Sequence, residues 1–179
     1  FTGGSIYIGA HYGDWLIPAA KLAGKRAARV AIIADSRTTP KFRRLIAERN
    51  LSGLAIIDAS ASAIDLALAI KSYIDRDYAV CFLGDRIRQQ GEHIAANFLG
   101  EAAPFSPGPF AVARLLQRPL YFFSCRRTSR TAHGRDSVRC VELWNGQGET
   151  SQAELLQRYV STLEAQVRVE GRRVEARLL

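Results

Sequence analysis

Short apolar runs alternate with amphipathic segments along almost the whole chain, and this alternation constrains the fold more than any other feature. We expect strands over residues 5–9, 29–34, 54–57, 78–83, 119–124 and 138–143, because each is an apolar run of strand length. Helical spacing predicts helices over residues 15–23, 40–50, 109–117 and 151–167. Another helix begins at Ser60 or Ser62, with Ile64, Leu68 and either Tyr73 or Ile74 on its apolar face. Strands separated by helices predict an α/β fold with a mostly parallel central sheet flanked by helices.

The length and charge of the chain narrow the class of protein. Its 179 residues suit a single domain over residues 1–179. Lys and Arg outnumber Asp and Glu by 25 to 17, a formal charge of +8 that favours an anionic partner such as nucleic acid, a membrane surface, a phosphorylated substrate or an acidic protein. The three cysteines lack CxxC spacing, which argues against a zinc site and indicates a reducing compartment. The chain begins with Phe1 and contains no Met, so we expect an upstream segment. Whether that segment carries a membrane anchor is left open.

A histidine and an acidic residue follow the first predicted strand. In open α/β sheets, ligands bind beyond the carboxyl ends of the strands, and His11 lies just past that end. Asp14 comes three residues later, in the opening turn of the next predicted helix. If that turn is helical, the two side chains share a face and the carboxylate can orient the imidazole as a general base. The alternative is that Asp14 caps the helix and His11 is an ordinary loop residue.

Two further strand ends carry polar or glycine-rich segments. Asp85 and Arg86 follow the strand at 78–83, where they can hold a polar substrate or form a simple ion pair. Ser106 and Gly108 stand in a proline-rich turn before the helix at 109–117, whose free N–H groups can receive a phosphate or an oxyanion. The alternative for that turn is a rigid helix entry. The sequence contains no Walker A, GxGxxG or GxSxG motif and no histidine pair at metal-ligand spacing.

Taken in order, these segments resemble a known enzyme family, the bacterial lysophospholipid/lipid A biosynthesis (lauroyl/myristoyl) acyltransferases. The resemblance covers most of the chain. Its elements are the strand with His-x-Gly at 6–13, the proline-introduced helix with Phe42-Arg43-Arg44, Asp85-Arg86 after a strand, the segment 98–110 followed by Ala113-Arg114, the strand at 119–123 and the late helix at 155–164.

The resemblance implies a glycerolipid-acyltransferase-like domain that moves a fatty acyl chain from acyl carrier protein or acyl-CoA to a hydroxyl or amine of a lipid acceptor. It implies His11 as general base, no metal or other cofactor, and substrate contacts from Asp85, Arg86, Ser106, Gly108 and Arg114. It also implies a peripheral enzyme at the cytoplasmic face of the bacterial inner membrane. An Arg-rich surface suits acidic acyl carrier protein and anionic lipid, with no nucleic acid as partner.

The chain departs from the family at one position. The family has an acidic residue five positions after its histidine, and this chain has Leu16 there. Either Asp14 orients His11 instead, or the chain is a catalytically degenerate member that binds acyl chains or acyl carrier protein. A nucleotide- or nucleic-acid-binding α/β module is a third hypothesis, suggested only by charge and fold class.

Overall fold

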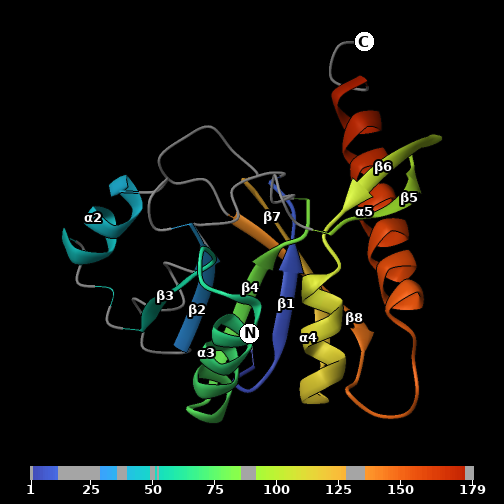
Figure 1. The fold of residues 1–179 in the computed structure, drawn as a ribbon. Coiled ribbons are helices and arrows are strands. Elements are labelled where there is room, and N and C mark those ends of the chain that lie inside the picture. Colours follow the sequence, from blue (N-terminus) through green and yellow to red (C-terminus); the bar gives the residue numbers. More distant parts are fainter. Residues whose placement is uncertain are drawn as a thin grey trace.

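A central sheet organises the molecule (Figure 1). The structure is a computed structural model that describes residues 2–11, 29–35, 40–48, 51, 53–85, 92–127 and 136–175. Within these ranges six strands lie in the order β3-β2-β4-β1-β7-β8. They are β1 (Ile6–Gly9), β2 (Arg29–Ala34), β3 (Leu54–Asp58), β4 (Tyr78–Leu83), β7 (Leu120–Arg127) and β8 (Asp136–Trp144). All neighbours are parallel except β7 and β8, which pair antiparallel.

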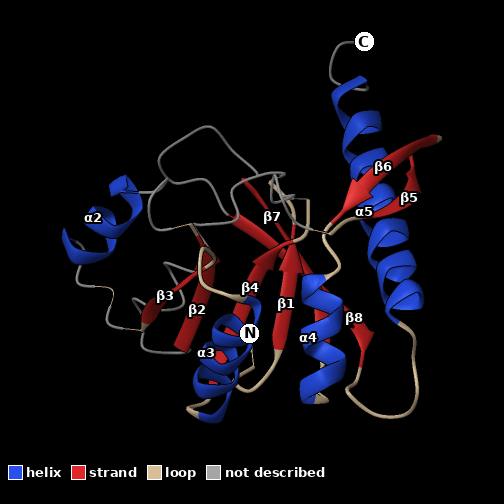
Figure 2. Ribbon diagram, viewed as in Figure 1, coloured by secondary structure: helices blue, strands red, loops and turns tan. Residues whose placement is uncertain are grey.

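This arrangement confirms the predicted α/β class with a mostly parallel sheet flanked by helices (Figure 2). The helices are α2 (Pro40–Glu48), α3 (Ala63–Asp75), α4 (Gly108–Leu116) and α5 (Gln152–Glu175). The helix predicted over residues 15–23 lies outside the described residues. All six predicted strands are present, with the last two longer than expected.

Each face of the sheet packs a separate apolar cluster. Ile6, Ile8 and Phe122 point to the face that α3, α4 and α5 cover. Tyr7 and Phe123, which alternate with them along β1 and β7, point to the opposite face. Strand β1 is buried along its whole length because both faces of the sheet are covered there. A strand buried on both faces needs apolar residues at nearly every position.

Helix α3 confirms one prediction and corrects another. Its N-cap is Ser62, whose hydroxyl accepts the backbone N–H of Asp65, which decides between the two candidate serines. The predicted apolar face is wrong at Ile64 and Leu68, which are 74% and 61% exposed. It is right at Ile74, which packs together with Ile70 against the sheet.

A hairpin between β4 and α4 was not predicted. Strands β5 (Ile94–Phe98) and β6 (Glu101–Phe105) form a separate two-stranded antiparallel sheet that lies against α5 (Figure 1). Its turn places Leu99 and Gly100 at φ values of 57° and 96°, the backbone of a type I′ turn. Sequence reasoning took the segment for a loop because it lacks the usual Asn-Gly signal and carries Pro104, which an edge strand tolerates.

Candidate functional site

Two strands that are far apart in the sequence end side by side at the carboxyl edge of the sheet. Strands β1 and β4 are parallel neighbours, and Gly9, the last residue of β1, is paired with Leu83, the last residue of β4. The chain continues from these ends into His11 and Asp85, each two residues beyond its strand. Parallel pairing therefore brings the two side chains to the same place.

His11 and Asp85 form a two-point contact. The Nδ1 atom of His11 lies 3.0 Å from Oδ1 of Asp85. The backbone N–H of His11 donates to the other carboxylate oxygen, Oδ2, over 2.8 Å. Because one carboxylate holds both the backbone and the ring of the same residue, it restrains the imidazole in position and in rotation.

This geometry indicates which ring nitrogen of His11 carries the proton and which carries the lone pair. An ionised carboxylate only accepts hydrogen bonds, so Nδ1 of His11 is the protonated nitrogen in the neutral ring. The lone pair then resides on Nε2, which faces away from Asp85 across the ring. The side chains of His11 and Asp85 are 46% and 30% exposed, so a substrate can reach the pair from solvent. The His11–Asp85 pair can therefore act as an oriented general base.

Close backbone packing holds the ends of β1 and β4 together next to the His11–Asp85 pair. The N–H of Gly84 donates to the carbonyl of Gly9 over 2.8 Å, so the two chain segments remain joined beyond the last paired residues. Glycine is needed at both positions for space. A Cβ on Gly84 would lie 2.6 Å from Cδ1 of Ile8, and a Cβ on Gly9 would lie 2.8 Å from the ring of Phe123.

The remaining predicted site residues are not all at this edge. Asp14 and Arg86 lie outside the described residues. Ser106 and Gly108 stand at the start of α4, where the chain arrives from β6. Arg114 is in the last turn of that helix, about 9 Å further along its axis and close to the start of β7. The structure thus brings together His11 and Asp85, and places Arg114 toward the other edge of the sheet.

The role of Asp85 as the partner of His11 was missed by sequence reasoning. The two residues are separated by 74 positions, and the nearest acidic residue in the sequence, Asp14, attracted the prediction. One signal was present: both residues follow predicted strands, and such ends meet at one edge of a parallel sheet.

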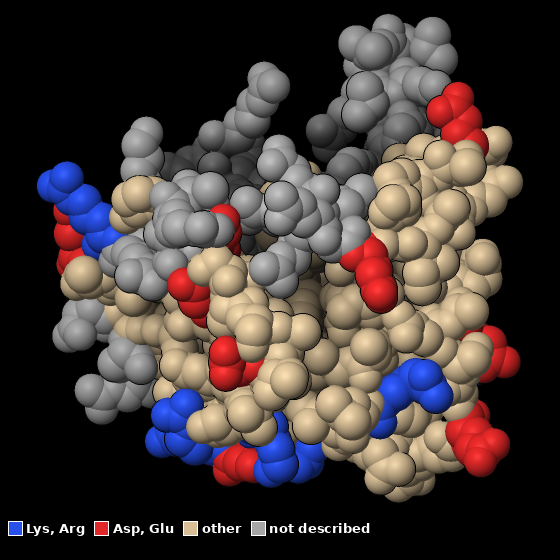
Figure 3. All heavy atoms as spheres, in the orientation of Figure 1, with Lys and Arg blue, Asp and Glu red and all other residues tan. Residues whose placement is uncertain are grey.

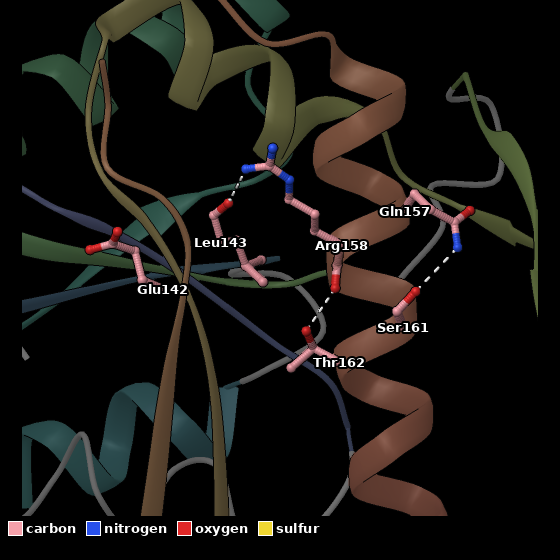
Figure 4. A pocket seen from close by; sticks show the side chains of 6 residues that line it. All are labelled: Glu142, Leu143, Gln157, Arg158, Ser161 and Thr162. Carbon is pink, nitrogen blue, oxygen red and sulfur yellow. Dashed lines mark hydrogen bonds between the residues drawn. The ribbon is translucent and has the colours of Figure 1, made fainter. Parts of the chain in front are cut away.

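A shallow groove lies elsewhere, between β8 and α5 (Figure 4). Its volume is about 360 Å³, and Glu142, Leu143, Gln157, Arg158, Ser161 and Thr162 line it. Arg158 donates to the carbonyl of Leu143 over 2.8 Å, and Thr162 donates to the carbonyl of Arg158 over 2.7 Å. Because β8 runs antiparallel, Leu143 lies near the start of β7, at the edge opposite to His11. The groove is therefore not part of the candidate site.

The charged residues of one face are visible in Figure 3. In this view the Lys and Arg atoms of the described residues gather mainly along the lower edge, below the starts of the parallel strands. The surface over β5, β6 and α5 is mainly uncharged, with acidic atoms at its margins. Most of the basic atoms visible here therefore lie toward the edge opposite to the one that carries His11, with a further group at the upper left.

The described residues contain no group of three His, Cys, Asp or Glu side chains that could hold a metal ion. None of the helices in these parts of the chain combines the length and the apolar composition needed to cross a membrane.

Comparison with known proteins supplies no family for the chain, since no protein-family model and no curated protein matches it. What the site can do follows from its geometry, in which a solvent-accessible imidazole is held by a carboxylate at the carboxyl edge of a parallel sheet.

Proposed function

We propose that the protein is an acyltransferase that moves a fatty acyl chain from an acyl thioester to a hydroxyl or amine of a lipid acceptor. The observation that carries the proposal is the 3.0 Å contact between Nδ1 of His11 and Oδ1 of Asp85. It leaves Nε2 as the base at an exposed edge, which is the arrangement that direct attack of an acceptor on a thioester requires. The resemblance of the sequence to lysophospholipid/lipid A acyltransferases supports the same reaction and a glycerolipid-acyltransferase-like domain.

The proposed reaction balances with His11 as the only proton carrier. Nε2 takes the proton of the acceptor hydroxyl or amine as its oxygen or nitrogen attacks the thioester carbonyl. The tetrahedral intermediate collapses by breaking the carbon–sulfur bond, and the imidazolium returns the proton to the leaving thiolate. The products are the acylated lipid and the free thiol of the acyl carrier protein or CoA.

Asp85 acts in this proposal as the carboxylate that orients His11. Its bond to Nδ1–H keeps the ring in the productive tautomer and stabilises the imidazolium that forms. This assignment removes the need for an acidic residue at position 16, where the sequence has Leu16. It also favours an active enzyme over a degenerate binding protein, since the base retains a carboxylate partner.

The proposed partners follow from charge and from the thioester donor. An acyl carrier protein is acidic and CoA carries phosphates, so both suit a chain with a formal charge of +8. An anionic bilayer that supplies the lipid acceptor suits the same charge, which is consistent with a peripheral enzyme at the cytoplasmic face of a bacterial inner membrane.

The test is acyl transfer by the purified chain, with palmitoyl-CoA and acyl carrier protein loaded with the same chain as alternative donors and lysophospholipid vesicles as acceptor. His11→Ala and Asp85→Asn should each lower kcat by about 10²–10⁴-fold, the usual contribution of general base catalysis. Asp75→Asn is the matched control, because Asp75 is an exposed carboxylate at the far end of α3, bonded to Lys71. It should leave kcat unchanged.

A second variant separates the two assignments of the carboxylate. Leu16→Glu restores the acidic residue that the family carries, and it should leave kcat unchanged because Asp85 already holds the imidazole. A large gain from Leu16→Glu would show that the pair is incomplete as it stands. Full acyl transfer by His11→Ala would overturn the mechanism, and thioester binding without transfer by the unmodified protein would establish the degenerate binding protein instead.

A further inference from the structure

A tyrosine hydroxyl from the C-terminal helix lies buried beneath the His11–Asp85 pair. Tyr159 is on α5 and is 0% exposed. Its ring is enclosed by three aromatic rings from β6, α4 and β7, with centroid distances of 6.0 Å to Phe105, 5.8 Å to Phe110 and 6.1 Å to Phe122. Such packing would be satisfied equally well by phenylalanine, so the hydroxyl needs an explanation of its own.

The hydroxyl of Tyr159 donates to the carbonyl of Gly9 over 3.0 Å, a contact between residues 150 positions apart. The same carbonyl accepts the N–H of Gly84 over 2.8 Å. Two donors thus occupy one oxygen, and they join three parts of the chain: the end of β1, the end of β4 and the middle of α5. His11 follows this junction by two residues and Asp85 by one.

The phenol tip also lies close to Gly84, the residue that precedes Asp85. A Cβ placed on Gly84 would lie 2.9 Å from Cζ of Tyr159, the carbon that carries the hydroxyl. Burial raises the pKa of Tyr159 well above its ordinary value, and the negative charge of Asp85 raises it further. The hydroxyl is therefore protonated at neutral pH and can donate its hydrogen bond there.

We propose that Tyr159 is a positioning residue for the His11–Asp85 pair: its hydroxyl fixes the Gly9–Gly84 junction from which both side chains extend. Fixing the two backbones relative to each other keeps the carboxylate at hydrogen-bond distance from Nδ1 of His11. The catalytic consequence rests on the proposed function, whereas the positioning itself does not. Helix α5 thereby contributes to the site through the carbonyl of Gly9, which accepts the hydrogen bond of Tyr159.

The test is the Tyr159→Phe variant, which removes the hydroxyl and keeps the ring. The readout is the tautomer of His11, measured from the ring ¹⁵N chemical shifts with His11→Ala used to assign the signals. The unmodified protein should show the Nδ1–H form, because Asp85 accepts that proton. Tyr159→Phe should show a mixture of both tautomers, since the carboxylate of Asp85 is no longer held at hydrogen-bond distance from Nδ1 of His11.

Tyr7→Phe is the matched control. Tyr7 is on the same strand as Gly9, is 3% exposed and also uses its hydroxyl, which accepts the N–H of Thr2 over 2.7 Å. Its ring points to the other face of the sheet, where it stacks on Tyr121. This variant should lose stability in urea denaturation and keep the Nδ1–H tautomer. A dispersed ¹H–¹⁵N spectrum confirms that each variant is folded.

Acyl-transfer kinetics then separate this proposal from the proposed function. Tyr159→Phe should lower kcat by about tenfold or more with an unchanged KM, as expected for a loosened general base. A Tyr159→Phe protein with the tautomer of the unmodified protein would refute the positioning role, even if acyl transfer is observed. If Tyr159→Phe changes the tautomer of His11 but the unmodified protein transfers no acyl group, the positioning role stands and the proposed function is refuted.

Discussion

Gly84 offers a direct test of how closely the backbone beneath the site is packed. The perturbation is Gly84→Ala, which adds one methyl group at the end of β4. In the present structure this Cβ would lie 2.6 Å from Cδ1 and 2.9 Å from Cγ1 of Ile8, and 2.9 Å from Cζ of Tyr159. Ordinary carbon–carbon contacts are at about 3.5–4.0 Å. Ile8 and Tyr159 are both 0% exposed, so neither can turn into solvent to make room.

The size of the effect follows from two opposing contributions. Overpacking a filled core costs about 1–3 kcal/mol. Replacing glycine by alanine returns about 0.4–1 kcal/mol by restricting the unfolded chain. We therefore expect Gly84→Ala to lower the free energy of unfolding by about 1–2 kcal/mol, or the Tm by about 2–8 °C in a domain of this size.

Urea denaturation followed by circular dichroism measures the change, with Ile8→Val as the partner in a double-mutant cycle. Valine lacks Cδ1, the atom closest to the added methyl group, so Ile8→Val should relieve part of the clash. Alone it should cost about 0.5–1.5 kcal/mol. Together, the two substitutions should cost less than the sum of their separate effects.

Gly108→Ala provides the control at another glycine. Among the described residues other than its two chain neighbours, a Cβ there would meet the hydroxyl of Ser106, at 3.6 Å, and the position is at the start of helix α4. It should be neutral or slightly stabilising. Strict additivity of Gly84→Ala and Ile8→Val, or a Gly84→Ala protein as stable as Gly108→Ala, would refute the close approach of β4 to β1 and α5.

Two further predictions concern the start of α5 and the cysteines. The pKa of Glu154 is lowered by hydrogen bonds from the backbone and side chain of Ser151. The ionised carboxylate therefore stabilises the folded state, fully so above its unfolded pKa of about 4.3. This stabilisation is lost as the pH falls through the lower pKa of the folded state. Glu154→Gln should therefore lower the Tm at pH 7 and change it less at pH 3; an equal change at both pH values would contradict this. Cys81 and Cys125 are buried and Cys140 is exposed, so a thiol reagent should modify Cys140 in the folded protein and all three thiols only in denaturant. Rapid modification of Cys81 without unfolding would contradict the buried position of β4.

Local sequence patterns predicted most elements of the sheet because strand formation left a strong local signal. Strands β1, β2 and β4 are apolar at nearly every position, as strands covered on both faces must be. The pattern was ambiguous for α3, where two apolar stripes run side by side. One contains Ile64 and Leu68, the other Ile70 and Ile74, and helical periodicity alone does not decide which stripe faces the core.

The β5–β6 hairpin shows where local signals fail. Its strands contain alanines and Pro104 in place of the usual β-branched residues, and its turn places Leu99 in a left-handed conformation that favours glycine or asparagine. One tertiary hydrogen bond and one within the hairpin compensate for this local cost. The N–H of Leu99 donates to the side chain of Glu164, and that of Gly100 donates to Asn97.

The class of the fold and the position of His11 at a strand end can be predicted without the structure, because both follow from local periodicity and from the order of strands and helices. The acidic partner of His11 cannot be predicted in this way, because it depends on tertiary structure. Asp85 is 74 residues away and reaches it because β4 lies next to β1 in the sheet, an order that no local pattern records. The contribution of Tyr159, 150 residues from Gly9, depends in the same way on where α5 packs. Strand order and helix docking are set by the summed packing of the whole core, and so is the geometry of this site.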